Sequence, residues 1–374
     1  MRYKIDRNHK ITRFLCLLLG MILLTGSMCI PVYAAEYWPE GPEVVSPNVI
    51  VMEASTGTVL YDRDSLEAHY PASITKILTA LIVIENCGLD ETVTFSNTAV
   101  NSLEPNSSIL GARAGDTLSV RDCLYALLLQ SANEVANALA EHCAGSIDAF
   151  AEKMNEKAAE LGCTDSHFAN PSGLNDPNHY VSAYDMALIA KAAFNNPTFV
   201  EVDSTTYYDV PAGKLKQYPD GWRYYAHHRM LRRNDSLYYD GAIGGKTGYT
   251  EAAGNTLVTY AKNDNTYLVS VVLQSVNGAY SDTKALLDYG FNNFSRTAVK
   301  DLPSKITRHL LPAEKYILKD YKDDMLFETR RTASVSLPSG VDSNALEKTY
   351  SITKNPADAF KGVRRICFYS ASTA

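Results

Sequence analysis

Strand-like segments lie at both ends of the central part of this chain, and helix-like segments fill the space between them. Two β-rich runs within 48–65 flank Thr56-Gly57 and predict a hairpin. Helix signals follow from Ser73 to about Asn196, strand signals return from Thr205, and an amphipathic run over 281–294 predicts a closing helix. This order lacks the regular alternation of strands and helices that builds a parallel sheet. We therefore predict an α+β fold, α/β in the broad sense, with a mostly antiparallel sheet flanked by helices and an inserted helical subdomain.

Caps mark two of the predicted helices. Ser146 precedes an amphipathic run that ends on Gly162, and Ser182 precedes a second run with Asp185 at the capping-box position. Leucines at helical spacing mark a third helix, at Leu124, Leu127 and Leu128. Two later strands, over 253–262 and 266–276, are joined by a turn-like segment, Asn263 to Asn265.

The first 34 residues have the pattern of a secretory signal peptide. Five basic residues come before or just at the start of an apolar core from Phe14 to Leu24, and Val32-Tyr33-Ala34 is a small-residue cleavage pattern. A retained membrane anchor is the alternative, but the apolar run is short for a membrane span. The pattern predicts secretion across the cytoplasmic membrane, to the cell surface or a periplasm-equivalent space.

Changes in composition divide the remainder of the chain. Residues 35–47 contain three prolines and indicate an extended leader. Residues 48–296 are long enough for one large domain with its own core. Further prolines and short β-like runs follow Arg296, so we predict a small β-rich domain over 297–374.

Charge and cysteine content exclude several classes of partner. Loss of the signal peptide would remove five basic residues and one acidic residue, so the formal net charge would move from −7 to −11, which argues against a nucleic-acid partner. The five cysteines that remain include no C-x-x-C pair, and no H-E-x-x-H motif occurs. We interpret the cysteines as buried thiols rather than a disulfide framework, and His227-His228 as a packed or solvated pair. We expect the protein to need no metal or other cofactor.

The tetrapeptide Ser-Ile-Thr-Lys occurs twice, in different contexts. Ser73 and Lys76 open a long apolar helix, so their Cβ atoms would lie about 5–6 Å apart on one helix face. The second copy, 351–354, runs into Asn355-Pro356, which breaks a helix. Only the first copy can hold a serine hydroxyl against a lysine amine, with the helix N-terminus favouring an anion there. A helix cap followed by a solvated lysine is the alternative.

A lysine can take the proton of a serine hydroxyl only when it is neutral, and burial or a neighbouring cation lowers its pKa. We therefore expect a second cation near Lys76. Lys246 is the candidate, because it belongs to the only Lys-Thr-Gly of the chain and lies just before a strand. Gly248 would let a substrate approach the strand edge, and the Thr247 hydroxyl would reach a carboxylate. An exposed lysine in a glycine-rich hairpin is the alternative.

Ser131-Ala132-Asn133 ends an apolar helical run and is the third polar motif. A helix end or an inter-helix turn would project both polar side chains into a cleft, where Ser131 could relay a proton and Asn133 could hold a substrate amide. Local turn chemistry is the alternative. Ser275-Val276-Asn277 repeats the pattern inside a strand-like run, so the tripeptide alone is not diagnostic.

Taken together, S-x-x-K at a helix start, S-x-N in the helical region and K-T-G on a late strand resemble the motifs of the low-molecular-mass penicillin-binding proteins that are D-alanyl-D-alanine carboxypeptidases. The resemblance runs from about Val49 to Phe294 and includes PASITKILTALIVIE, LLLQSANEVANALAEH, FANPSGL, HYVSAYDMALIA and DGAIGGKTGYTEAAGNTLV. It is weak after Arg296. It implies a DD-peptidase/β-lactamase-like fold with a small C-terminal domain.

The resemblance also implies acyl transfer in two steps. Ser73 would attack the carbonyl between the two D-alanines that end a peptidoglycan stem peptide, while Lys76 takes its proton. Backbone N–H groups of Ser73 and Tyr249 would stabilise the oxyanion. Ser131 would pass a proton to the leaving D-alanine, and Lys246-Thr247 would bind the terminal carboxylate. β-Lactam antibiotics would be trapped as covalent inhibitors, because their ring-opened leaving group stays attached.

Other functions stay open at this point. A serine β-lactamase needs a further carboxylate for its deacylating water, and Glu160 and Glu201 are the available candidates. A catalytically silent wall-binding protein would be expected to lack a motif residue, and none is missing. An ester hydrolase lacks support, because K-T-G suits a substrate that carries a carboxylate.

The chain departs from this family in two places. Relatives commonly carry an arginine shortly before the closing helix, whereas no arginine occurs between Arg233 and Arg296, and Ala279 or Ser281 stands there. Relatives also commonly end in an amphipathic membrane helix, which 355–374 matches poorly. Association with the membrane surface, the preferred stem-peptide variant and the oligomeric state therefore stay open.

Overall fold

The computed structural model of the protein describes residues 38–299 and, beyond them, 305–306, 327–328, 333–341, 351–352 and 366–367. The predicted signal peptide lies outside the described residues. Within the described ranges, no helix is both long and apolar enough to cross a membrane.

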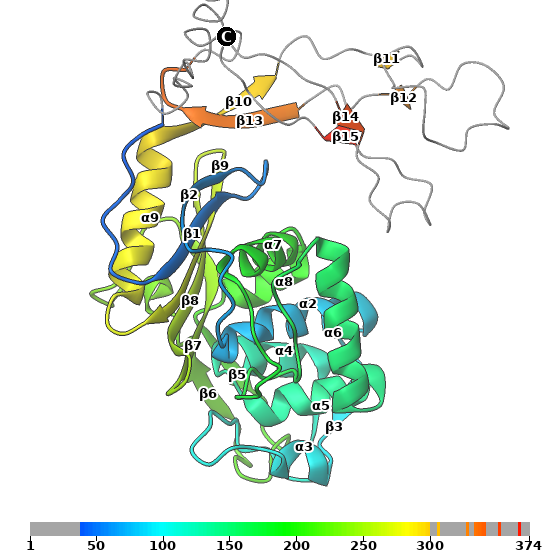
Figure 1. Ribbon diagram of the computed structural model, residues 1–374. Coiled ribbons are helices and arrows are strands. Elements are labelled where there is room, and N and C mark those ends of the chain that lie inside the picture. Colours follow the sequence, from blue (N-terminus) through cyan, green and yellow to red (C-terminus); the bar gives the residue numbers. More distant parts are fainter. Residues whose placement is uncertain are drawn as a thin grey trace, which may run out of the picture.

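A five-stranded antiparallel sheet forms the centre of the molecule (Figure 1). In spatial order its strands are β2 (Val59–Arg63), β1 (Asn48–Glu53), β9 (Thr266–Ser275), β8 (Gly254–Asn263) and β7 (Ala242–Thr250). All neighbouring strands run antiparallel, and β1 and β2 form the predicted hairpin. The predicted fold class is therefore confirmed.

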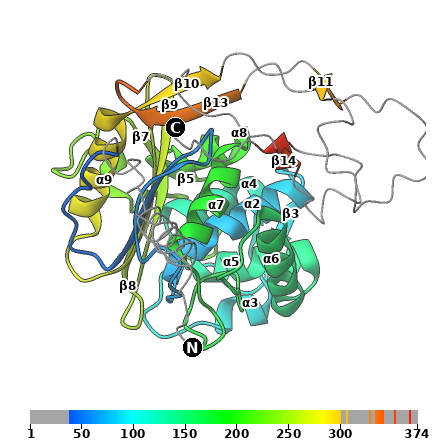
Figure 2. The same cartoon turned by 45° about the horizontal axis from the view of Figure 1, so that its top comes forward.

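Both faces of this sheet are covered by helices. Helix α9 (Ala279–Asn293) packs on one face, and the helical subdomain covers the other, as the two views in Figure 1 and Figure 2 show. Val49 and Val51 of β1 belong to the core on the α9 side, whereas Ile50 and Met52 belong to the core on the subdomain side. Because successive side chains point to opposite faces and both faces are buried, the strand has a continuous apolar sequence.

The helical subdomain lies in sequence between β2 and β7. Its helices are α2 (Lys76–Asn86), α3 (Asn97–Asn101), α4 (Val120–Leu129), α5 (Asn133–Ala144), α6 (Ile147–Leu161), α7 (Ala183–Phe194) and α8 (Pro197–Asp203). The 3-10 turns are η2 (Ala72–Thr75), directly before α2, and η3 (Arg229–Leu231). Two small antiparallel pairs are β3 (Thr92–Thr94) with β4 (Thr117–Ser119) and β5 (Tyr207–Val210) with β6 (Trp222–Tyr225). The pair β3–β4 interrupts a stretch that was predicted to be helical. The sequence did not indicate these strands, because three residues per strand are too few to give an alternation signal.

The predicted caps are present, with one difference. Ser146 caps α6 through its side chain, and α6 ends at Gly162, whose φ of +89° is left-handed. The Ser182 hydroxyl accepts a hydrogen bond from the Asp185 N–H at 3.1 Å at the start of α7. The Asp185 carboxylate does not complete a capping box, because it accepts a 2.8 Å bond from the Ser166 hydroxyl instead. Asp185 therefore ties the start of α7 to the preceding loop.

The segment before β1 and the strands after α9 are both attached to the main body. Residues 38–47 contain no helix or strand, and the N–H groups of Val45 and Ser46 donate to the Asp282 carboxylate of α9. After α9, β10 (Phe294–Val299) pairs with β13 (Ala333–Pro338). The Ser336 hydroxyl lies 3.1 Å from that of Thr56.

Two further short pairs are described near the C-terminus. They are β11 (Lys305–Ile306) with β12 (Phe327–Glu328) and β14 (Ser351–Ile352) with β15 (Ile366–Cys367). The second Ser-Ile-Thr-Lys copy thus begins in a strand rather than at a helix start. Most of 297–374 lies outside the described residues, so the small β-rich domain stays a prediction.

Candidate active site

The start of α2 brings a serine and a lysine together. Ser73 lies in η2, and the Lys76 ammonium donates a 2.9 Å hydrogen bond to its Oγ. Lys76 has no exposed surface, and its Nζ also contacts Asn133 Oδ1 at 2.7 Å and the Ser172 carbonyl oxygen at 2.5 Å. All three contacts of this amine are oxygen atoms.

Burial lowers the pKa of Lys76 well below its usual value, and the positive charge of Lys246 lowers it further. The Glu134 carboxylate has the opposite effect. Glu134 stands in the first turn of α5, where its Oε1 accepts 2.7 Å hydrogen bonds from the N–H groups of Leu110 and Gly111. Both effects that can make a lysine a base at neutral pH are therefore present at Lys76.

Lys246 lies within β7 rather than just before a strand, and it is buried rather than exposed. The side chain is 1% exposed, and its Nζ donates a 2.7 Å hydrogen bond to the Thr247 carbonyl oxygen. Burial lowers the pKa of Lys246, and the buried Asp203 carboxylate raises it. Thr247, Gly248 and Tyr249 line a cavity that Lys246 does not reach.

Two glycines let backbone segments close around Ser73. A Cβ atom at Gly248 would lie 2.8 Å from the Ser73 nitrogen and 2.4 Å from Thr256 Oγ1. A Cβ atom at Gly173, where φ is +86°, would lie 1.9 Å from the Ala72 carbonyl oxygen. The sequence predicted that a substrate would approach β7 closely at Gly248. In the structure, the backbone nitrogen of Ser73 makes a close approach there. Ala72 has a φ of +50°, which is strained for a residue other than glycine.

Ser131 and Asn133 lie in the turn between α4 and α5. Both are buried and line the cavity, and Ser131 has a left-handed φ of +62°. Asn133 is the first residue of α5, and its side-chain oxygen is engaged by Lys76. The second S-x-N copy ends β9, and its Val276 and Asn277 line the mouth of the same cavity.

The cavity has a volume of about 1030 Å³. Of the predicted site residues, six line it, namely Ser73, Ser131, Asn133, Thr247, Gly248 and Tyr249. The two lysines, Lys76 and Lys246, lie behind its wall. The structure therefore brings the three motifs together, with hydroxyl and amide groups facing the cavity and both cations buried.

Sequence reasoning missed two basic residues of the cavity wall, His227 and Arg229. Burial lowers the pKa of His227 to about 4, whereas its neighbour His228 is buried and lies 2.9 Å from Thr259 Oγ1, as expected of a packed residue. Arg229 pairs with Asp235 through two hydrogen bonds of 2.8 Å. No motif marks these positions, because η3 is only three residues long and follows an irregular Tyr-rich stretch.

The two carboxylates that were considered for the deacylating water of a β-lactamase, Glu160 and Glu201, are not at the site. Glu160 and Glu201 have side chains that are 59% and 60% exposed, and neither belongs to the cavity wall. Potential metal ligands are found elsewhere: among the described residues, Cys87, Glu91 and His142 form one group of three. Cys87, Cys123, Cys143 and Cys163 are free thiols.

The antiparallel sheet, the helical insertion and the paired S-x-x-K, S-x-N and K-T-G motifs define the class of serine acyl-transfer enzymes. Residues 35–277 match the family model of peptidase S11, D-alanyl-D-alanine carboxypeptidase, and the chain belongs to this family. It is a hydrolase, a serine-type D-Ala-D-Ala carboxypeptidase, and the resemblance read from the motifs is confirmed.

Individual relatives agree with this assignment. The D-alanyl-D-alanine carboxypeptidase DacB2 of Mycobacterium tuberculosis is 35% identical over 262 residues, which cover 68% of this chain and 84% of that protein. DacF of Bacillus subtilis is 28% identical over 347 residues, and the aligned region covers 91% of this chain and 84% of DacF. The crystal structure of DacD from Francisella tularensis is similar with a TM-score of 0.67 at 25% identity, covering 84% of this chain and 86% of that one.

Proposed function

We propose that this carboxypeptidase removes the terminal D-alanine of peptidoglycan stem peptides through an acyl-enzyme on Ser73. The observation that carries the proposal is the buried Lys76 amine, 2.9 Å from Ser73 Oγ at the wall of the cavity. Mass spectrometry of the purified protein with a peptide ending in D-Ala-D-Ala tests it. Released D-alanine and a transient adduct on the Ser73 peptide support the proposal, and product release without a serine adduct contradicts it.

The contacts of Lys76 fit a neutral base. A neutral amine has two N–H donors and one lone pair. The Asn133 and Ser172 oxygens accept hydrogen bonds but have no proton to give, whereas the Ser73 hydroxyl can donate. A neutral Lys76 would therefore donate to the first two and accept from Ser73, which aligns the amine lone pair with the proton that must leave.

The oxyanion of the tetrahedral intermediate would be bound by backbone N–H groups. A Cβ atom at Gly248 would lie 2.8 Å from the Ser73 nitrogen, and Tyr249 follows Gly248 on β7, which supports the Ser73 and Tyr249 N–H groups as the pair of donors. Loss of one such donor typically costs about 10²–10³ in rate. Ser131 would pass a proton to the leaving D-alanine, and Asn133 would hold both Lys76 and the substrate amide.

The terminal carboxylate of the substrate would bind near Thr247. Thr247 and Gly248 of the K-T-G motif line the cavity, and the buried Lys246 would act through its charge. Arg229 provides a second cation at the rim, restrained by Asp235. This arrangement supports a site that favours substrates with a free carboxylate, including β-lactams, which would acylate Ser73.

The predicted location follows from the substrate. Peptidoglycan is assembled outside the cytoplasmic membrane, so we infer that residues 1–34 are the signal peptide and that the mature enzyme works on the outer side, with membrane-surface association open. N-terminal sequencing of the secreted protein tests this inference. A mature protein that begins before residue 20 would contradict the cleavage pattern at Ala34.

The pH dependence of acylation should reveal the influence of the Lys246 charge on the base, Lys76. Lys246→Gln removes a positive charge that lowers the pKa of Lys76, so that pKa should rise. Because Lys76 acts as a base only when neutral, the acid limb of the pH–rate profile should move to higher pH. The measurement is the second-order rate of acylation by a chromogenic β-lactam across the pH range in which the protein stays folded.

The matched control for this profile is Lys262→Gln, which removes an exposed lysine of β8. The position of the acid limb is decisive rather than the absolute rate, because Lys246→Gln also weakens carboxylate binding. A limb that stays in place, or moves to lower pH, in Lys246→Gln would exclude Lys246 as the cation that tunes the base.

A missing arginine can be restored at Ser281. This residue is exposed, lines the cavity and is one of the two residues, with Ala279, that stand where relatives commonly carry the arginine. One charge-assisted contact is worth about 1.5–3 kcal/mol, or roughly 10–150-fold in affinity. Ser281→Arg should therefore lower KM for a D-Ala-D-Ala peptide with little change in kcat. Steady-state kinetics beside Ser281→Gln measure this, and an equal drop in KM with glutamine, or none with arginine, contradicts it.

A further inference from the structure

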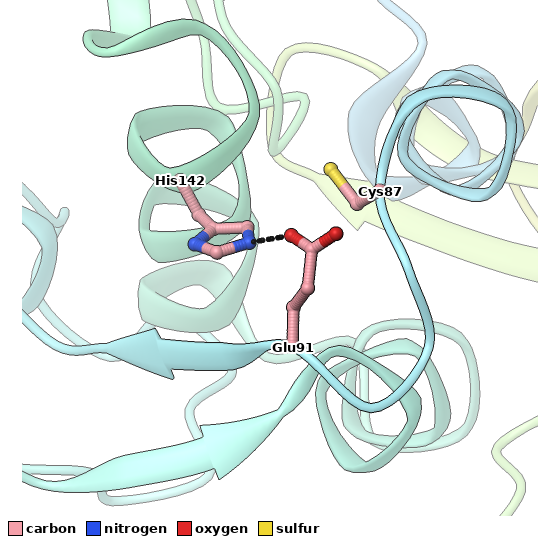
Figure 3. Close-up of side chains that lie close together, drawn as sticks. All are labelled: Cys87, Glu91 and His142. Atoms are coloured by element: carbon pink, nitrogen blue, oxygen red, sulfur yellow. Dashed lines mark hydrogen bonds and ion pairs between the residues drawn. The ribbon is translucent and has the colours of Figure 1, made fainter.

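Three side chains with metal-binding atoms meet near the C-terminal ends of α2 and α5 (Figure 3). Cys87 is the C-cap of α2, Glu91 directly precedes β3, and His142 lies in the last turn of α5. One ligand atom from each lies within 4.8 Å of the other two. The three come from different elements, so they form a site only in the folded chain.

The local contacts hold these groups toward one another. His142 Nε2 lies 2.8 Å from Glu91 Oε2, and Glu91 Oε1 accepts a 2.7 Å hydrogen bond from the Gly88 N–H. The thiol of Cys143 is a neighbour of the Cys87 thiol. His142 is 23% exposed and Glu91 is 52% exposed at the side chain, so an ion can reach the group from solvent.

We propose that Cys87, Glu91 and His142 bind a divalent transition-metal ion of the zinc type. Thiolate, imidazole and carboxylate together are the donor set that zinc prefers. Ligand atoms around a tetrahedral zinc lie about 3.3–3.8 Å apart, given bond lengths of about 2.0–2.3 Å. The three ligand atoms lie within 4.8 Å of one another, so they would have to approach by about 1 Å to reach that spacing.

Binding has to displace the protons and contacts that the group now holds. The Cys87 proton would pass to solvent as the sulfur binds the ion, and the His142–Glu91 contact would be replaced by two metal–ligand bonds. The thiol and the imidazole must both be free of the proton at the atom that binds the ion. Binding should therefore weaken as the pH falls.

The position of the group gives the ion a structural task. Helices α2 and α5 begin at the active site, where Lys76 Nζ and Asn133 Oδ1 are 2.7 Å apart, and both end at this group. A bound ion would join the far ends of the two helices whose near ends hold the base. The ion takes no part in acylation, because it lies outside the cavity wall.

Cobalt titration of the reduced, metal-free, tag-free full chain tests the proposal. We expect one equivalent of Co(II) to give thiolate-to-metal charge-transfer absorption and visible bands of tetrahedral intensity, both removed by zinc. Cys87→Ser and His142→Gln should weaken binding by roughly tenfold or more. Cys163→Ser and Glu85→Gln serve as matched controls, since Cys163 is a buried thiol elsewhere and Glu85 is an acid on the same helix paired with Lys157.

Thermal unfolding gives a second readout. Zinc at about 100 times its Kd should raise Tm by roughly 5–10 °C, and Cys87→Ser should lose this rise.

Penicillin labelling of each variant shows that it has folded, and labelling should persist in a strong chelator. Absent charge-transfer absorption, or equal absorption in Cys87→Ser, would overturn the proposal. A Cys87–Cys143 disulfide in the isolated protein would also overturn it, if mass analysis detects the disulfide and the reduced protein then takes up no cobalt.

Discussion

Ser73→Ala is expected to lose all covalent labelling by a fluorescent penicillin while keeping its fold. The hydroxyl is the only group on the Ser73 side chain that can form the acyl bond, and it is the oxygen that Lys76 contacts at 2.9 Å. Ser73 is partly exposed at the wall of the cavity, so the loss of one oxygen atom should leave the core unchanged. Gel fluorescence and circular dichroism measure the two effects.

Ser351→Ala is the matched control for this experiment, because Ser351 begins the second Ser-Ile-Thr-Lys copy and lies in β14. It should label like the unaltered protein. The nucleophile would have to be reassigned if label persisted on Ser73→Ala, or if peptide mapping found it on Ser351.

The second large effect is expected from Lys76→Arg, which should be almost inactive in acylation. A guanidinium stays protonated at any workable pH and cannot take the serine proton. Loss of a general base costs about 10²–10⁴ in rate. The readout is the single-turnover rate of acylation by penicillin, with Lys262→Arg on the exposed side of β8 as the control.

Lys76 is fully buried, so the larger arginine side chain can disturb packing as well as chemistry. Lys76→Met separates the two effects, because it removes the amine from a chain of similar length. Both variants should be slow, and Lys76→Met should show a native Tm to within a few degrees. Acylation near the normal rate in a folded Lys76→Met protein would place the base elsewhere.

The fold could be predicted from the sequence because the order of strand and helix signals admits few arrangements. β1 and β9 are far apart in sequence, but both have continuous apolar runs, which require burial on both faces of the strand. Only a central position in the sheet buries both faces. Short elements such as β3 were missed, since three residues cannot show a period. The capping box at Asp185 was wrong in part, because a loop hydroxyl competes for the carboxylate.

The site was predictable only as far as its motifs extend. The helix start at Ser73 and the inter-helix turn at Ser131 follow from local sequence, and the charge coupling of Lys76 to Lys246 was inferred from chemistry. That Lys246 is buried depends on the register of β7, which no local pattern fixes. Arg229 enters the wall from a segment without a motif, and the group at Cys87 assembles from three separate elements.

The fit of Ser73 between two glycines limits how this enzyme can change its substrate range. A side chain at Gly173 would push away the Ala72 carbonyl, and one at Gly248 would push away the Ser73 amide, so either would misplace the attacking oxygen. The centre of the site thus has almost no room for variation. Adaptation to a different stem peptide has to occur at the outer wall, where exposed side chains such as Glu104 and Tyr249 can be exchanged without moving the serine.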